Sequence, residues 1–258
     1  MMKHFRFNLK FVLYLLALMM VKFSFAAGNI EVVTAEGSVM VGDAQGKMTK
    51  AVHSKSVLLT GNVLSTGPDA RAVVRVGTDG FVVLGKNSKI EINQSNKEKP
   101  GFFKQISGII YYAINSIKGK KRSMEVRTAT TTIGIRGTRF LVTDFEGRTE
   151  IGMRKGVVSV TSTDGDFEIH TKSEQNAFEA FKQEGEAAMA QSEREFEAYK
   201  TKTQQEFVEF KREFSLEENR MASFDGNRVV ERPLSGETKK DMDSIENYAE
   251  EWLKNVQD

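Results

Sequence analysis

The chain has 258 residues, of which 40% are hydrophobic and 28% are charged, and it contains no cysteine. This length supplies enough apolar material for a hydrophobic core in one or two domains. The absence of cysteine excludes disulfide bonds, thiolate chemistry and a lipid anchor attached to a cysteine.

Residues 1–26 have the pattern of a secretory signal peptide. Three basic residues precede an uncharged apolar run from Phe11 to Val21, and Ser24 and Ala26 place small residues where a signal peptidase reads them. The run is shorter than the roughly 20 residues that a membrane-spanning helix needs. We therefore expect cleavage near Ala27 and a periplasmic or secreted protein without a membrane span, although an uncleaved anchor is the alternative.

The predicted signal peptide accounts for the net positive charge of the chain. It holds four of the 37 basic residues and no acidic residue, so the remainder carries 33 basic and 35 acidic side chains. The resulting formal charge of −2 gives no indication of nucleic-acid binding.

Residues 28–170 alternate between apolar and polar side chains in short runs. Val158 and Val160, for example, alternate with Ser159, which is the pattern of a strand with one buried face. Turn sequences such as Asp164-Gly165 separate these runs. The pattern predicts an all-β domain, built as a sandwich, a roll or a short β-helix.

The pattern changes at Thr171, where Thr171-Lys172-Ser173-Glu174 fits a helix capping box. It predicts a long amphipathic helix over residues 171–224, a linker over 225–237 and a short C-terminal helix over 238–256. Aromatic and methionine side chains of the long helix would fall within an arc of about 80°. This predicted interaction face comprises Phe178, Phe181, Met189, Phe196, Tyr199, Phe207, Phe210 and Phe214, and it extends to Met221.

Three arrangements would bury such a stripe: packing along the β domain, a helical bundle or coiled coil with another chain, or binding to a membrane surface. The helix is rich in glutamate, which disfavours the membrane surface. A domain of about 140 residues is too small to cover the whole stripe. We therefore expect the helix to contact another chain, including a second copy in a homo-oligomer.

Catalytic and metal-binding patterns are weak. After the predicted signal peptide the only histidines are His53 and His170, and no nucleophile or phosphate-binding motif appears. The aspartates of Asp164-Gly165-Asp166 lack the spacing of a calcium-binding EF-hand loop, and a hairpin explains them. We expect no enzymatic activity, no catalytic residue, no metal and no cofactor.

The most specific segment runs from Thr128 to Phe140, with the core Ile135-Arg136-Gly137-Thr138-Arg139-Phe140. It resembles the signature of the FecR domain, in which a strand bearing Thr and Ala leads into Val-Arg-Gly-Thr-x-Phe. The resemblance continues upstream in Leu64–Pro68 and Ala72–Val76 and downstream in Gly156–Val160, and it covers about residues 57–162. Members of the family often have Thr-Pro where this chain has Thr128-Ala129.

The motif residues are Thr128, Gly134, Arg136, Gly137, Thr138 and Phe140. The two glycines allow an unusual φ or a close approach of two backbones, and the arginine offers five donors to nearby carbonyls or carboxylates. We interpret the motif as a buried corner that fixes strand register, in preference to a ligand site.

The resemblance implies an extracytoplasmic module that binds or relays and does not catalyse. The best-known members pass signals from an outer-membrane receptor to an extracytoplasmic sigma factor, through a cytoplasmic segment ahead of a membrane span. Only ten residues precede the apolar run here, which we consider too short for that segment. The leading hypothesis is an exported binding or scaffolding protein that recognises a protein or a cell-wall component. The alternative is a membrane-anchored regulator of FecR type.

Overall fold

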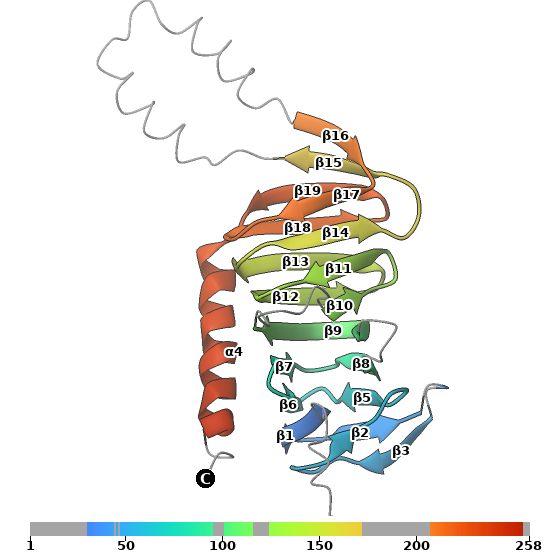
Figure 1. Cartoon of the computed structure of the whole chain (residues 1–258), viewed down its shortest axis with the longest axis vertical. Coiled ribbons are helices and arrows are strands. Elements are labelled where there is room, and N and C mark those ends of the chain that lie inside the picture. The colour runs from blue at the N-terminus through green and yellow to red at the C-terminus, as the bar shows by residue number, and fades with distance from the viewer. Residues whose placement is uncertain are drawn as a thin grey trace, which may run out of the picture.

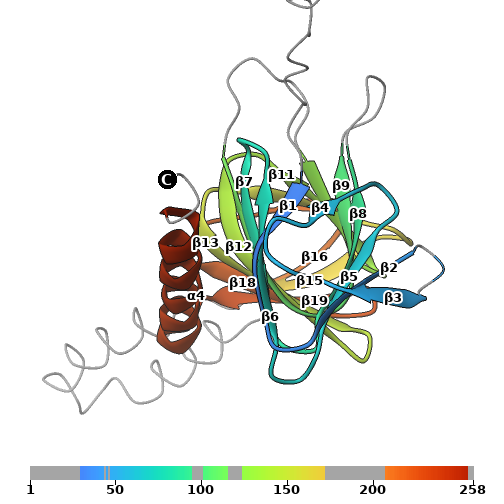
Figure 2. The ribbon, with the colours of Figure 1, turned by 90° about the horizontal axis from the view of Figure 1, so that it is seen from below.

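The computed structural model describes residues 30–43, 45, 47–94, 101–115, 124–171 and 207–254. Within these ranges the chain forms a β-roll, in which two sheets face each other and the strands are stacked along the long axis of the molecule (Figure 1). One helix, α4 (Gly236–Lys254), runs along the outside of the roll (Figure 2).

The first sheet, here called sheet A, extends from one end of the roll to the other. In spatial order its strands are β4 (Val57–Leu58), β1 (Ile30–Glu36), β6 (Arg71–Val76), β7 (Gly80–Leu84), β9 (Phe102–Ile114), β12 (Thr138–Phe145), β13 (Arg148–Lys155), β18 (Arg220–Asp225), β19 (Arg228–Pro233), β15 (Phe167–Thr171) and β16 (Phe207–Lys211). Neighbouring strands are antiparallel except for the parallel pair of β19 and β15.

The second sheet, sheet B, faces it across the core. Its strands are β3 (Met48–Ala51), β2 (Val39–Gly42), β5 (Val63–Thr66), β8 (Lys89–Asn93), the first half of β9, β10 (Met124–Arg127), β11 (Thr131–Ile135), β14 (Val158–Ser162) and β17 (Glu213–Leu216). Strand β9 belongs to both sheets and passes between them at Gly108, which has a φ of +94°. A Cβ atom there would lie 2.3 Å from the Cα atom of Ser88, so the crossing requires glycine.

The main core lies between the two sheets and follows the two-residue alternation of the strands. Near its middle the rings of Tyr112 and Phe140 are stacked with their centroids 5.0 Å apart. Towards the β16 end, Phe167 contacts Phe214 and Phe224 edge to face, at 5.7 and 5.6 Å. Each of these buried side chains contributes about 1.5–3 kcal/mol to stability through the apolar surface that it removes from water.

A second, smaller core lies between α4 and the outer face of sheet A. Its buried members are Val33, Val73, Phe81, Val83, Tyr111, Ala113, Met221, Leu234, Met242 and Ala249. The helix begins after Ser235, whose hydroxyl accepts a hydrogen bond from the backbone N–H of Thr238 at 3.1 Å. This element corresponds to the predicted helix at 238–256 and begins two residues earlier.

The predicted long helix followed by a short one is wrong. Where the structure describes this region, residues 207–233 form the strands β16 to β19, and α4 is the helix that follows them. Phe207 and Phe210 lie in β16, Phe214 in β17 and Met221 in β18. The predicted linker at 225–237 contains β19.

Two-residue alternation explains why these residues form strands. Phe214 and Leu216 are buried and alternate with exposed Glu213 and Ser215, although the wider spacing of the aromatic residues also fits a helix. The Asp225-Gly226 sequence, at the start of the predicted linker, forms the turn between β18 and β19. Phe178, Phe181, Met189, Phe196 and Tyr199 lie outside the described residues, as does the predicted signal peptide.

Candidate interaction site

The motif that carries the FecR resemblance forms a corner between the sheets. Arg136 and Gly137 connect β11 in sheet B to β12 in sheet A, and Gly137 has a φ of +68°. The chain passes close by again at Gly156, where a Cβ atom would lie 2.9 Å from the carbonyl oxygen of Gly137. Thr138 and Phe140 are buried immediately after the corner. Two glycines therefore allow the backbones of β12 and the β13–β14 turn to touch.

The other motif residues have separate roles. Thr128 closes the turn between β10 and β11, because its hydroxyl accepts a hydrogen bond from the backbone N–H of Thr131 at 3.1 Å. Gly134 lies within β11, paired with Ser159, and has an ordinary strand conformation. The Arg136 side chain is exposed, and among the described residues it makes no hydrogen bond or ion pair. The structure thus brings the motif together as a corner and leaves its arginine at the surface.

A polar cluster attaches α4 to sheet A. The hydroxyl of Tyr111 donates a hydrogen bond of 2.9 Å to one carboxylate oxygen of Glu246, and burial together with this carboxylate raises the pKa of Tyr111. The Nε atom of Arg139 lies 2.8 Å from the other oxygen, an ion pair that lacks hydrogen-bond alignment. The sequence analysis did not predict this cluster. The one feature that could have indicated it is the position of Glu246 beside the apolar face of the predicted C-terminal helix.

Two further contacts attach α4 on either side of Glu246. Arg154 of β13 donates a hydrogen bond of 2.8 Å to Asp243. The guanidinium of Arg71 lies 4.2 Å above the ring of Tyr248, a cation–π contact. Burial raises the pKa of Tyr248, and the negative charge of the nearby Glu36 carboxylate raises it further. The helix is thus fixed to strands from both the N-terminal and the central part of the roll.

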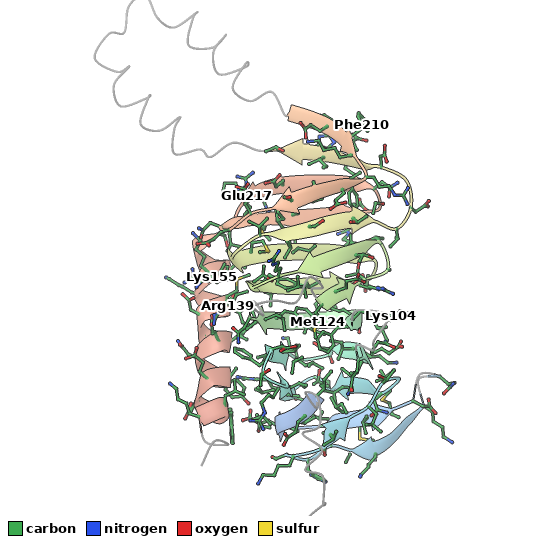
Figure 3. The ribbon with its side chains drawn as sticks, viewed as in Figure 1. Lys104, Met124, Arg139, Lys155, Phe210 and Glu217 are labelled. Atoms are coloured by element: carbon green, nitrogen blue, oxygen red, sulfur yellow. The ribbon has the colours of Figure 1, made fainter. Side chains whose placement is uncertain are left out.

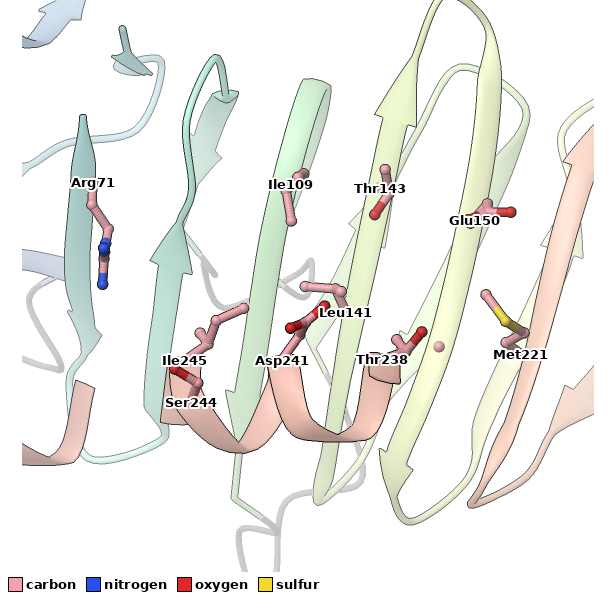
Figure 4. Close-up of a pocket in the computed structure, with 11 residues that line it drawn as sticks. Arg71, Ile109, Leu141, Thr143, Glu150, Met221, Thr238, Asp241, Ser244 and Ile245 are labelled. Atoms are coloured by element: carbon pink, nitrogen blue, oxygen red, sulfur yellow. The ribbon is translucent and has the colours of Figure 1, made fainter. Parts of the chain in front are cut away.

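An open groove of about 450 Å³ lies beside α4 on the outer face of sheet A (Figure 4). Its lining residues are Arg71, Ile109, Leu141, Thr143, Glu150, Gly152, Met221, Thr238, Asp241, Ser244 and Ile245. Its lining combines apolar side chains of the sheet and helix with hydroxyls, carboxylates and one guanidinium. Protein interfaces likewise combine apolar and polar groups.

Gly152 of β13 leaves room for side chains that pack on the outer face of sheet A. A Cβ atom there would lie 2.9 Å from the terminal methyl group of Met242 and 3.0 Å from a terminal methyl group of Leu234. Sequence patterns gave no sign of the groove, because its walls come from strands and a helix that are distant in the chain.

The fold and this groove define the class of the protein: a β-roll with a helix fixed to one outer face and an open groove beside it. Residues 62–159 match the protein family described as FecR protein. The match confirms the resemblance predicted from the Arg136-Gly137-Thr138 motif, and the chain contains a FecR domain. The matched region begins just before β5 and ends in β14, so β1 to β4, β15 to β19 and α4 lie outside it.

Two solved structures of a "putative anti-sigma factor" from Parabacteroides distasonis, at 1.65 and 2.50 Å resolution, are similar to this chain at 12% sequence identity and a TM-score of 0.44. The similarity covers 68% of this chain and 61% of each of those chains, so less than two thirds of their length is spanned. No curated protein matches the chain. Among the described residues no helix is both long enough and apolar enough to cross a membrane.

Proposed function

We propose that this chain is a non-enzymatic, exported envelope protein that uses its FecR-containing β-roll to bind a partner protein. The groove between α4 and sheet A carries this proposal. The FecR match supports an envelope role, and the predicted signal peptide supports export.

The chemistry of the groove favours an extended protein segment as its ligand. Leu141 and Met221 offer apolar contact to side chains, and the hydroxyls of Thr143, Thr238 and Ser244 can both donate and accept hydrogen bonds to a peptide backbone. The carboxylates of Glu150 and Asp241 would favour basic side chains on the partner. A cell-wall component is the second class of ligand, and the same experiment tests it.

The test measures which envelope components the folded chain captures. It compares a Thr→Arg variant in the groove with a Thr→Arg variant on the opposite sheet. Thr143→Arg places a long charged side chain in the groove. Thr132→Arg is the matched control, because Thr132 is half-buried on the outer face of sheet B. We expect the first variant to lose a partner that the second retains. Equal capture by both variants would refute the groove as the binding site.

Point variants are needed because a chain that ends near residue 172 would lack β16 to β19 and α4. These elements contribute to both hydrophobic cores, through Phe214 and Phe224 in one and Met242 and Ala249 in the other. Such a truncation would remove the fold together with the site.

The second candidate is a membrane-anchored regulator of FecR type, which the family match favours. The state of the N-terminus distinguishes the two. A mature N-terminus near Ala27 in protein isolated from the envelope would support the exported binding module. Intact residues 1–26 in membrane-bound protein would support the regulator.

A further inference from the structure

Strand β16 forms one edge of sheet A. It pairs with β15 on one side, and among the described residues no strand pairs with its other side. Val208 and Phe210 lie on the same face of this edge, opposite His170 and Glu168 of β15, and 42% and 69% of their surface is exposed. Figure 3 shows Phe210 at the end of the roll. An edge strand offers unpaired N–H and C=O groups to another strand, and proteins usually protect such an edge with charged residues or proline. Large exposed apolar side chains at an edge instead indicate a contact surface.

The opposite face of β16 carries charge. Glu209 and Lys211 lie on this face and form an ion pair with each other. They line a hollow of about 510 Å³ at the end of the roll, together with Glu213, Glu231 and the apolar side chains of Ile169 and Phe214. The edge therefore presents alternating apolar and charged residues, and Phe210 is flanked by Glu209 on one side and Lys211 on the other.

We propose that β16 pairs antiparallel with β16 of a second copy of this chain, about a two-fold axis that passes through Phe210. In this register Phe210 lies opposite Phe210 of the partner subunit, and Glu209 lies opposite Lys211 of the partner subunit. The apolar side chains meet on one face and opposite charges meet on the other, and both kinds of cross-strand pair stabilise a sheet. A two-fold interface must be self-complementary, and this short sequence meets that condition.

Neighbouring registers of the two β16 strands do not meet this condition. An axis through Glu209 places two glutamates opposite each other, and an axis through Lys211 does the same with two lysines. Like charges directly opposite one another destabilise a strand pair. The charge pattern thus selects the register centred on Phe210.

The interface is small. A pair of five-residue strands buries much less than the roughly 800 Å² per partner of a standard stable interface. The dimer is accordingly reversible, and it forms as the protein concentration rises.

The absence of cysteine from the chain allows a direct test by cross-linking. Cβ atoms directly opposite each other in an antiparallel pair are about 4.5–5.5 Å apart, close to the separation that a disulfide bridges. We expect Phe210→Cys to give a covalent dimer under mild oxidation. Val208→Cys tests the register, because it would face Arg212 of the partner subunit. Phe145→Cys is the surface control, because Phe145 is 39% exposed on the same sheet but away from the edge. Monomeric Phe210→Cys, or equal cross-linking of all three variants, would overturn the proposal.

Charge exchange provides an independent test by sedimentation equilibrium. Glu209→Lys and Lys211→Glu should each weaken the dimer at least tenfold, and the double exchange should restore it to within threefold of the parent chain. Far-ultraviolet circular dichroism confirms that each variant is folded. A parent chain that stays monomeric at high concentration, or a double exchange without recovery, would show that β16 does not pair with itself.

Discussion

The attachment of α4 to sheet A gives the sharpest test of the energetics. Glu246→Ala leaves the hydroxyl of the buried Tyr111 without its acceptor, which costs about 1.5–3 kcal/mol when the partner is charged. The ion pair with Arg139 adds less than about 1 kcal/mol, because 29% of the arginine side chain is exposed. We therefore expect the free energy of unfolding to fall by about 2–3 kcal/mol, which lowers the urea midpoint by about 1 M.

The assay uses the single tryptophan of the chain, Trp252, which packs against the sheet from α4. Its fluorescence follows docking of the helix during urea titration, while circular dichroism follows the strands. The control is Asp243→Ala, which removes an ion pair with Arg154 whose members are 47% and 36% exposed, and which should cost less than about 1 kcal/mol. Equal losses in the two variants would refute the role assigned to Glu246. So would a change below about 0.5 kcal/mol, the size typical of surface substitutions.

Three further predictions concern the β-roll itself. Burial raises the pKa of Asp144 above its ordinary value of 3.8, so the folded state binds a proton more tightly than the unfolded state. Stability therefore falls as the pH rises from 3.8 through the raised pKa. Asp144→Asn should remove this fall and make the protein more stable at neutral pH, measured by urea unfolding between about pH 3 and 8. Gly156→Ala should lower the free energy of unfolding by more than about 3 kcal/mol, because a clash with the corner adds to the strain of its positive φ. Gly147→Ala should lower it by only about 1–2 kcal/mol, since nothing lies within 4 Å of the added Cβ atom. Equal thermal unfolding midpoints for the two variants would contradict this reasoning. Phe140→Ala should cost about 3–5 kcal/mol through the cavity that it leaves, and a loss below 1 kcal/mol would show that this part of the core is loosely packed.

Much of the β-roll is visible in the sequence because its signals are local. The alternation of Val158 and Val160 with Ser159 places β14, and Asp164-Gly165 lies in the turn before β15, where Gly165 has a φ of +68°. The C-terminal helix is likewise visible from its apolar face. These elements were predicted because each one shows its buried face within a few residues.

The region from Phe207 to Asp225 was mispredicted because two periods overlap in it. Phe207, Phe210 and Phe214 are spaced by three and four residues, as on a helix, while Phe214 and Leu216 also alternate as in a strand. Pairing with β14 and β15, which is set by distant parts of the chain, decides between the two. Intrinsic preference is a weak guide when tertiary contacts compete with it.

The groove and the Tyr111–Glu246 contact are beyond sequence reasoning for the same reason. Tyr111 and Glu246 are 135 positions apart, and only the docking of α4 brings them together. The β16 edge could be found only once the spatial order of the strands was known.

Stacked-strand proteins often behave as one-dimensional arrays, in which each layer depends mainly on its neighbours and the ends can open first. Helix α4 changes this behaviour, because it lies across the layers and contacts β1, β7 and β13. Opening the N-terminal layers would strip apolar cover from the C-terminal helix, and release of the helix would expose those layers to water. We therefore expect the two ends of the described chain to unfold in one transition. A destabilising substitution at either end should then lower the stability of the other end as well.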